Sequence, residues 1–182
     1  MTLHIITANK HKVREITQMI SDIKQLNIDL PEIQETNSKK VITAKLIEAQ
    51  KHHNGEFIIE DTSLHIHALN GLPGPLIKWF LDSIGTHGIF KILNAYEDKR
   101  ATATTYIGYS DINGKIQFFN GEIDGKIVAP RGENGFGWDA IFQPINSSKT
   151  FAEMSDQEKS KFNMRTIAIK KLKEYLNKVK KY

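Results

Sequence analysis

The stretch from Ile58 to Leu81 reads I-I-E-D-T-S-L-H-I-H-A-L-N-G-L-P-G-P-L-I-K-W-F-L and combines a strand, a loop and the start of a helix with several chemically active side chains. An apolar strand end leads directly into two adjacent carboxylates, Glu60 and Asp61, where charge is costly unless it is paired or bound to a metal. A short alternating segment, a Gly-Leu-Pro-Gly-Pro loop and Lys78 at the start of a helical pattern follow. Carboxylates bind divalent cations, and a glycine-rich loop with a lysine binds phosphate. The stretch therefore predicts metal-dependent phosphate chemistry.

The composition predicts one folded domain, with room for two lobes, rather than a disordered or membrane-spanning chain. The sequence has 182 residues, of which 40% are hydrophobic and 25% are charged, so a packed core can form. It contains no cysteine, which excludes disulfides and thiolate metal sites and fits a reducing compartment. Neither an apolar run of membrane-spanning length nor a signal peptide is recognisable. We expect a cytoplasmic protein that does not associate with membranes.

The formal net charge of +4 favours anionic ligands weakly. Much of the excess is a lysine cluster within residues 170–181, in the last predicted helix. Such a cluster is expected on a solvated helix face, where it also complements the helix dipole. The alternative is a nucleic-acid patch, but the cluster lacks interleaved aromatic residues and a binding motif. We expect no stable binding of nucleic acid.

The first third of the chain alternates strands and helices. Apolar runs predict strands over residues 3–7, 28–32 and 57–61, and helical spacing predicts helices over 10–21 and 38–52. Ser38 is the expected N-cap of the second helix. The turn after the first strand places backbone N–H groups and a lysine at a helix N-terminus, which is a ready anion site.

The alternating segment 63–69 raises the alternative of a zinc site. His65 and His67 share one face of a strand, but no third ligand is evident. We therefore expect both histidines to be ordinary sheet residues.

The second half of the chain reads as an antiparallel meander followed by helices. Helices are expected over 77–84 and 89–93, and β-prone residues extend over 101–129 around an Asn-Gly hairpin turn. An aromatic, glycine-rich loop and a short strand at 141–142 come next. Ser155 and Glu158 form a predicted capping box before the long C-terminal helix. The element order predicts an α/β fold with a mixed sheet.

The candidate site residues each have an ordinary alternative explanation. Carboxylates and lysines usually face solvent, aromatic residues usually belong to the core, and Gly-Pro loops usually turn corners. Their positions beside apolar strands argue for function instead. The residues alone predict a phosphate-binding α/β enzyme.

Four sequence blocks resemble the inosine triphosphate pyrophosphatase family, also called the Ham1 family, and they occur in the family's order. The resemblance spans nearly the whole chain. Each motif is short, but their joint occurrence is specific, and the P-G-P-L-I-K-W-F and A-P-R-G strings look most like the eukaryotic branch. The blocks are residues 7–12 (T-A-N-K-H-K), 60–80 (from E-D-T-S-L to I-K-W-F), 127–144 (with A-P-R-G and F-G-W-D) and 150–165 (with T-F-A-E-M).

The resemblance implies an elongated, two-lobed α/β fold with a central mixed β-sheet, flanking helices and a nucleotide cleft between the lobes, all within one domain over residues 1–182. It implies hydrolysis of inosine, deoxyinosine and xanthosine triphosphates to the monophosphate and pyrophosphate. Mg²⁺ is the implied cofactor, with Mn²⁺ as a substitute, and a homodimer is the implied assembly. The alternative is a catalytically impaired nucleotide-binding or regulatory module of the same fold.

The resemblance also assigns roles to residues that match the family's motifs. Asp61 matches the general base, and Glu32 and Glu60 join it as metal carboxylates. The phosphate contacts are implied to be Thr7, Asn9, Lys12, Lys45 and Lys78. The base is implied to stack on Phe136 and Trp138 and to be read at its edge by Asp139, Lys159 and Arg165.

One position departs from the family. The family usually has Ser-His-Arg at the start of the last helix, whereas this chain has Asn163-Met164-Arg165. A methionine side chain neither donates nor accepts a strong hydrogen bond. We expect phosphate hydrolysis to be kept and base preference to be broadened or weakened.

Overall fold

The structure is a computed structural model that describes residues 2–179, apart from the side chain of His11. The last two lysines of the predicted C-terminal cluster lie outside the described residues. The chain divides into two compact units of several segments each. Unit 1 comprises Met1–Asp61, Thr105–Asn120 and Arg165–Tyr182, and unit 2 comprises Thr62–Thr104 and Gly121–Met164. The single domain, elongated shape and cleft expected from the sequence stay predictions.

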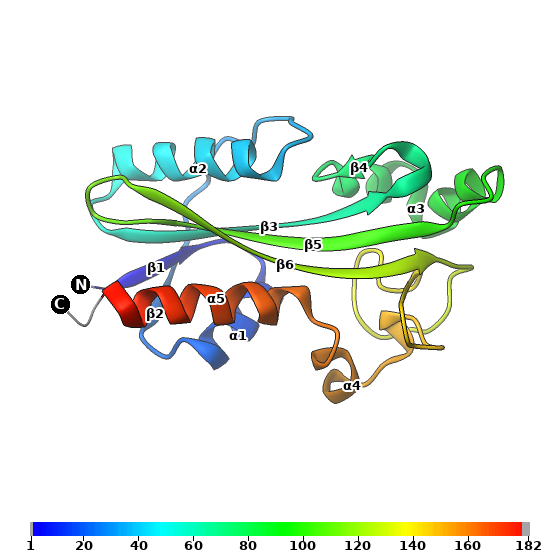
Figure 1. Cartoon of the computed structure of the whole chain (residues 1–182). Coiled ribbons are helices and arrows are strands. Elements are labelled where there is room, and N and C mark those ends of the chain that lie inside the picture. The colour runs from blue at the N-terminus through cyan, green and yellow to red at the C-terminus, as the bar shows by residue number, and fades with distance from the viewer. Residues whose placement is uncertain (1, 180–182) are drawn as a thin grey trace. The chain divides into compact units, whose positions relative to one another are not determined.

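Over residues 2–179, seven strands pair in one mixed sheet of order β2-β1-β3-β5-β6-β7, with β4 added to β3 (Figure 1). β1 runs parallel to both β2 and β3, whereas β4 and β7 pair antiparallel with β3 and β6. The predicted α/β class with a central mixed sheet and flanking helices is confirmed. The strands are β1 (Leu3–Ile6), β2 (Ile23–Leu26), β3 (Glu56–Ile66), β4 (Pro73–Gly74), β5 (Arg100–Ser110), β6 (Ile116–Ile127) and β7 (Phe142–Pro144).

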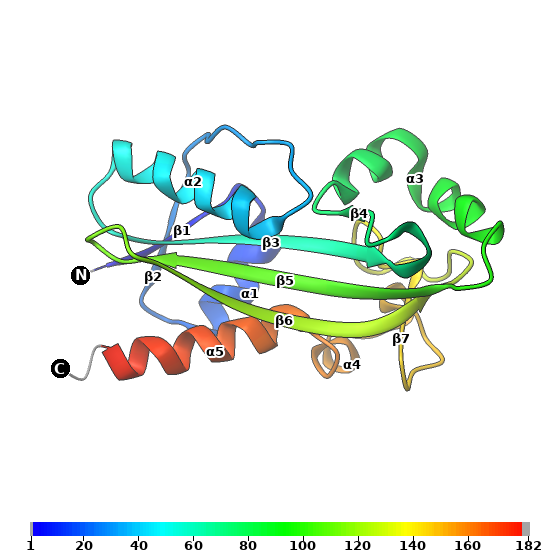
Figure 2. The same cartoon turned by 45° about the horizontal axis from the view of Figure 1, so that its top comes forward.

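Unit 1 is a three-layer arrangement of α1 (Lys10–Met19), α2 (Ser38–His52), α5 (Met164–Val179) and the strands between them. Helix α2 lies on one face of the strands, and α1 and α5 lie on the other (Figures 1 and 2). The alternation of strand side chains explains this order. Phe57 and Ile59 pack with α2, and Ile58 between them packs with α1 and α5. The strand predicted to end at Asp61 continues to Ile66. The apolar first part of β3, which leads into Glu60 and Asp61, is therefore buried on both faces.

Unit 2 has its own apolar core beside the second half of β3. This core includes Leu64, Ile77, Ile89, Trp138 and Phe142. Helix α3 spans Ile77–Asn94 but is interrupted at Gly85, whose backbone has φ 64° and ψ −177°. The prediction of two separate helices in this region is confirmed. The other helical segments of this unit are η1 (His67–Leu69), η2 (Phe151–Glu153) and α4 (Asp156–Ser160).

The strand predicted over residues 28–32 is wrong. The second strand is β2, Ile23–Leu26, which pairs with β1 in register Leu3↔Ile23, and residues 28–32 have no regular structure. Pro31 has no N–H to donate to a strand ladder, and Ile28 and Leu30 instead pack against the core below α2. Glu32 consequently lies in an irregular segment that leads to α2.

The N-cap of α2 is Asn37 and not Ser38 as predicted. The Asn37 side chain accepts hydrogen bonds from Lys39 N at 3.0 Å and Lys40 N at 3.4 Å, whereas Ser38 is the first residue of the helix. The capping box of Ser155 and Glu158 is confirmed in both directions.

We predict that Asn37→Ala destabilises the protein because two backbone N–H groups lose their acceptor. The expected loss of unfolding free energy is about 0.5–2 kcal/mol, measured by urea denaturation. Asn27→Ala, at an exposed position outside the helices and strands, is the control and should change the midpoint little. Equal shifts in the two variants would contradict the cap assignment.

The β5–β6 hairpin forms where the Asn-Gly signal predicted it. Asp111 N donates to Lys115 O at 3.1 Å, and Gly114, with φ 82°, closes the turn. Among the helices of residues 2–179, none combines the length and apolar character that a membrane span requires.

Candidate active site

The turn between β1 and α1 is built by the side chains that the sequence proposed for phosphate binding. Thr7 Oγ1 accepts a hydrogen bond from Asn9 N at 3.1 Å, and Asn9 Oδ1 accepts one from Lys12 N at 3.3 Å. Asn9 thus caps the first turn of α1, which starts at Lys10. Thr7 and Asn9 shape the helix N-terminus, and its dipole favours an anion.

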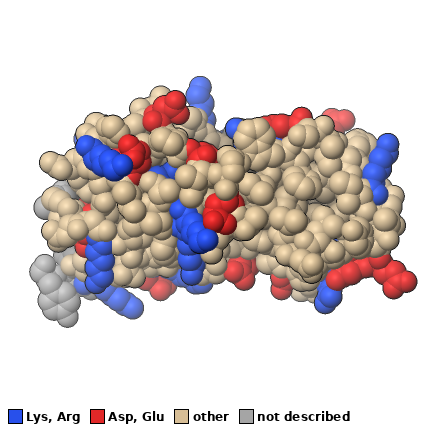
Figure 3. All heavy atoms as spheres, turned by 90° about the horizontal axis from the view of Figure 1, so that it is seen from above, with Lys and Arg blue, Asp and Glu red and all other residues tan. Residues whose placement is uncertain are grey.

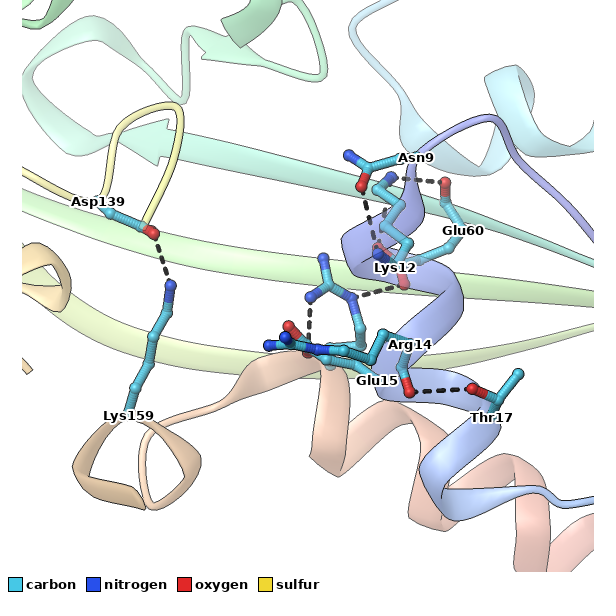
Figure 4. A network of polar contacts seen from close by, with 9 residues as sticks. Asn9, Lys12, Arg14, Glu15, Thr17, Glu60, Asp139 and Lys159 are labelled. Carbon is cyan, nitrogen blue, oxygen red and sulfur yellow. Dashed lines mark hydrogen bonds and ion pairs between the residues drawn. The ribbon is translucent and has the colours of Figure 1, made fainter. Parts of the chain in front are cut away.

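Glu60 is the centre of a buried ionic network in unit 1 (Figure 4). Its side chain is 0% exposed, and Arg165 Nε donates to its Oε2 at 2.7 Å. Lys12 Nζ lies 3.4 Å from Glu60 Oε1 and also donates to the backbone carbonyl of Glu60 at 3.2 Å. The second arm of Arg165, Nη1, donates to Glu15 Oε2 at 2.7 Å. Glu60 therefore joins the start of α5 to the lysine of α1.

These two carboxylates stabilise the charged form of Arg165. Burial lowers the pKa of the guanidinium, but the charges and hydrogen bonds of Glu60 and Glu15 outweigh it and raise this pKa above its ordinary value. The side chain of Arg165 is only 5% exposed. Arg165, which we expected to contact the nucleotide base, forms ion pairs with Glu60 and Glu15. Glu60, which we expected to bind a metal ion, forms ion pairs with Arg165 and Lys12.

Asp61 has the most unusual environment of the predicted site residues. Burial raises the pKa of this carboxyl. A hydrogen bond from the Ser38 hydroxyl and the positive charges of Lys12 and Lys45 lower the pKa and so offset part of this increase. Its Oδ2 atom is buried and has no hydrogen-bond partner in the described part of the chain. A buried carboxylate oxygen without a partner is energetically costly, and perturbed carboxyls of this kind are typical of catalytic sites.

Glu32 and Lys45 lie together beside Asp61. Lys45 Nζ is 2.5 Å from Glu32 Oε2, and their side chains are 20% and 57% exposed. Glu32 raises the pKa of Asp61 through its charge, while Lys45 lowers it. On the face that carries α2, basic and acidic side chains lie next to one another (Figure 3). Lys45, which looked like a surface residue by helical pattern alone, is thus close to the candidate base.

Of the three carboxylates proposed as metal ligands, two are placed so that they could bind a divalent cation. Within residues 2–179, no group of three or more His, Asp and Glu side chains could hold a metal ion. Mg²⁺ at nucleotide sites, however, is usually bound through one or two carboxylates together with substrate phosphates and water. Asp61 offers an unpartnered oxygen, and Glu32 offers an exposed carboxylate nearby. These two fit such an ion, whereas Glu60 does not, because Lys12 and Arg165 occupy its oxygens.

A second cluster lies in unit 2, around Asp139. Asp139 Oδ2 accepts a hydrogen bond from Phe136 N at 3.0 Å and from Lys159 Nζ at 2.5 Å. The ammonium of Lys159 also lies 5.6 Å from the ring centre of Phe136. Gly135 has φ 87°, and a Cβ there would meet Asp139 Oδ2 at 2.2 Å, so the loop closes tightly over the carboxylate. Asp139 therefore holds both the loop of Phe136 and the side chain of Lys159.

The two aromatic residues of this loop differ in exposure. Phe136 is 44% exposed, whereas Trp138 is 7% exposed. The indole of Trp138 packs edge-on against Phe142, with ring centres 5.4 Å apart, and belongs to the core of unit 2. Met164 is buried in the same core. Of the two aromatic residues, Phe136 is the more exposed, and Met164 serves as packing.

Lys78 is the second residue of α3, shortly after the Gly-Pro loop. His65 fixes this loop: its Nδ1 is 3.2 Å from Gly71 O, and its Nε2 is 3.0 Å from Ser63 Oγ. His67 contacts Thr102 Oγ1 at 3.0 Å. The expectation that both histidines are structural agrees with these contacts. Lys78 belongs to unit 2, together with Phe136, Trp138, Asp139 and Lys159, while the other predicted site residues belong to unit 1.

Two residues of the site were missed by the sequence reasoning. Glu15 follows Lys12 by three positions on α1, so helical spacing already placed both on one face. Ser38 was interpreted only as a cap. Its hydroxyl is buried beside Asp61, and no sequence pattern signals this contact, because it joins a helix start to the middle of a distant strand.

Comparisons of the sequence and of the structure with known proteins both find Ham1 proteins or inosine triphosphate pyrophosphatases. The model of the Ham1 family matches residues 3–175. An inosine triphosphate pyrophosphatase of Schizosaccharomyces pombe is 42% identical over 175 residues, which cover 94% of this chain and 93% of the relative. The inosine triphosphate pyrophosphatase 1 of Trypanosoma cruzi is 38% identical over 176 residues, covering 94% and 90%. The solved structure of the Staphylococcus aureus Ham1 protein superposes with a TM-score of 0.86 at 26% identity, covering 97% of this chain and 98% of that one.

Proposed function

The chain belongs to the Ham1 family, as the sequence blocks predicted, and we propose that it hydrolyses inosine, deoxyinosine and xanthosine triphosphates to the monophosphate and pyrophosphate. The observation that carries this proposal is Asp61, a buried carboxylate with an unpartnered oxygen and two neighbouring lysines. A general base needs a raised pKa to accept a proton efficiently. Burial supplies that shift here, and the lysines supply positive charge for phosphates.

In the proposed mechanism Asp61 takes a proton from the attacking water. The water oxygen bonds to the α-phosphorus, the bond from that phosphorus to the bridging oxygen breaks, and pyrophosphate leaves. Lys12 and Lys45, with Lys78 and the N-terminus of α1, hold the negative charges of the triphosphate. Mg²⁺ or Mn²⁺, when bound, would be held by Asp61 and Glu32 and would supply Lewis-acid neutralisation of phosphate oxygens and a lower pKa for water. Glu60 keeps Lys12 in position, and Arg165 keeps Glu60 in position.

The base is proposed to stack on Phe136 and to be read by Lys159. Hypoxanthine and xanthine present an acceptor at O6, where adenine presents a donor at N6. A lysine has only donors, so adenine leaves a donor unpaired, which costs about 1–3 kcal/mol or roughly 5- to 150-fold. Asp139 acts by orienting Lys159 and the loop. Trp138 supports the loop from the core, and Arg165 is assigned to the Glu60 network.

The proposed function is tested by pyrophosphate release from a panel of ITP, dITP, XTP, GTP and ATP, with and without Mg²⁺. We expect turnover of the first three that requires the metal. Nucleotide binding without turnover would support the non-enzymatic module instead.

Phe136→Ala is expected to weaken substrate binding because one stacking face is lost. Stacking of a base on an aromatic ring contributes about 1–3 kcal/mol, so KM for ITP should rise roughly 5- to 150-fold in a steady-state assay. Tyr96, also in unit 2, is similarly exposed at 42%, and Tyr96→Ala serves as the control. An unchanged KM in Phe136→Ala would remove this residue from the base site.

We propose that two copies of the chain associate. Helix α3 carries exposed apolar side chains, among them Trp79 at 54% and Ile84 at 41% exposure, and aromatic side chains are enriched in interfaces. Light scattering after size exclusion tests the homodimer. A cytoplasmic location is part of the same proposal, and cell fractionation tests it.

A further inference from the structure

The side chain of His65 lies against the Gly-Pro loop, residues 71–75, in unit 2. Its Nδ1 atom is 3.2 Å from the carbonyl oxygen of Gly71, and its Nε2 atom is 3.0 Å from Ser63 Oγ. A Cβ added at Gly74 would lie 3.2 Å from His65 Cε1, so the ring also lies against the backbone there. The imidazole therefore bridges two points of the loop, Gly71 and Gly74.

The two hydrogen bonds of this ring have a defined direction. A backbone carbonyl only accepts, so Nδ1 of His65 carries a hydrogen and donates it to Gly71 O. In the neutral ring Nε2 is then an acceptor, and the Ser63 hydroxyl is its donor. Ser63 is 0% exposed, so water does not compete for this hydroxyl. Ser63 therefore orients the imidazole, and the imidazole holds the loop.

The loop transmits this constraint to the first turn of α3. Pro73 pairs with His65 across β3 and β4, and Leu76 N donates to Pro73 O at 3.1 Å. Leu76 O in turn accepts from Trp79 N at 3.0 Å, within the first turn of the helix. Lys78 lies in that turn, so the position of its backbone depends on the loop.

The side chain of Lys78 has no support of its own. It is exposed, and no hydrogen bond or ion pair with any residue of the range 2–179 holds its ammonium group. A lysine in the first turn of a helix is also disfavoured by the helix dipole. The charge at this place therefore favours an anionic ligand rather than the fold.

We propose that His65 is a positioning residue for Lys78 and that it acts, through the Gly-Pro loop, on the binding of the substrate's phosphates. The inference rests on the proposed function, in which Lys78 helps to hold the triphosphate. A lysine side chain loses conformational entropy when it binds an anion, and a mobile backbone would add to this loss. The His65 ring fixes the loop before the substrate binds and so removes the second part of the cost. His65 thus affects affinity rather than the chemical step.

The test is a double-mutant cycle of His65→Leu and Lys78→Met. It measures KM and kcat for ITP with Mg²⁺, and Kd for inorganic triphosphate. Lys78→Met should raise KM by about tenfold or more, because a charge-assisted contact is lost. His65→Leu should raise KM about 3- to 10-fold and leave kcat within about threefold of wild type. In the Lys78→Met background, His65→Leu should change KM by less than about twofold, and Kd should follow the same pattern.

Two further substitutions separate the hydrogen bond from the packing of the ring. The amide nitrogen of asparagine takes the place of Nδ1, so His65→Asn keeps a donor for Gly71 and should restore most of the wild-type KM. His65→Gln places its amide near Nε2 instead and should behave like His65→Leu, which it replaces in the cycle if the leucine variant is unfolded. His67→Leu is the control and should leave KM unchanged, because the His67 ring contacts Thr102 in β5.

Three outcomes of the cycle would overturn the inference. The first is an unchanged KM in His65→Leu. The second is an undiminished effect of His65→Leu in the Lys78→Met background, which would show that the ring acts on something other than Lys78. The third is a His65→Asn enzyme as weak as His65→Leu, which would assign the effect to packing.

The binding measurements keep this inference distinguishable from the proposed function. If wild type binds inorganic triphosphate but releases no pyrophosphate from any nucleotide, the proposed hydrolysis fails, and the cycle of Kd values still decides the role of His65. If wild type does not bind inorganic triphosphate, the phosphate role of Lys78 fails and the inference fails with it.

Discussion

Asp61→Asn is expected to reduce pyrophosphate release by about 100- to 10,000-fold, the usual contribution of a general base. The amide preserves the shape of the side chain but cannot take a proton from water. The same change should not destabilise the fold. Burial raises the pKa of Asp61, so the charged form is disfavoured in the folded protein, and a neutral amide removes that cost. Pyrophosphate release and thermal unfolding of the same preparation measure both effects.

The stability effect of Asp61 has a defined pH dependence. Because the folded protein binds this proton more tightly than the unfolded chain does, the free energy of unfolding falls as pH rises from the ordinary carboxyl pKa through the raised one. Asp61→Asn should abolish this part of the dependence.

Asp29→Asn is the matched control for Asp61→Asn. It makes the same charge change at an exposed position of unit 1 and should change neither rate nor stability. Retention of wild-type turnover in Asp61→Asn would exclude Asp61 as the base.

Arg165→Met is expected to cause the largest loss of stability among single substitutions in the site. It leaves the fully buried Glu60 carboxylate without its 2.7 Å partner. Removing one partner of a buried ion pair costs about 3–5 kcal/mol, which corresponds to a melting temperature lower by roughly 6–20 °C for a chain of this size. The loss should be measured by calorimetry. Because Glu60 also holds Lys12, KM for ITP should rise in any folded fraction.

Two further variants separate the buried charge from the lost packing. Arg14→Met changes an exposed arginine of α1 and should shift the melting temperature by little. Glu60→Gln in the Arg165→Met background removes the uncompensated charge and should recover part of the loss. A melting temperature of Arg165→Met equal to that of Arg14→Met would contradict the buried network, and no recovery in the double variant would contradict its ionic character.

Patterns of neighbouring residues in the sequence were sufficient to predict most of the helices, strands and turns. The apolar run before Glu60, the Asn-Gly turn and the Ser155 capping box each depend on neighbouring residues, so their structures were predictable. The strand expected at 28–32 was wrong because apolar content alone cannot show that a segment packs without pairing. The cap of α2 was misplaced by one residue because Asn37 and Ser38 are both good caps, and only backbone geometry distinguishes them.

The stretch around Glu60 and Asp61 shows the division between sequence and tertiary structure most clearly. The sequence alone predicted that two carboxylates adjoin a buried apolar run, that a phosphate-type turn precedes α1, and that the chain resembles a nucleotide-hydrolysing family. The different environments of these two neighbours follow from the fold. Successive side chains of a strand point to opposite faces, so Glu60 meets Arg165 and Lys12 while Asp61 meets Ser38 and Lys45. Those partners lie far away in the sequence, and the protonation and hydrogen bonding of a buried carboxylate depend on the groups that folding brings to it.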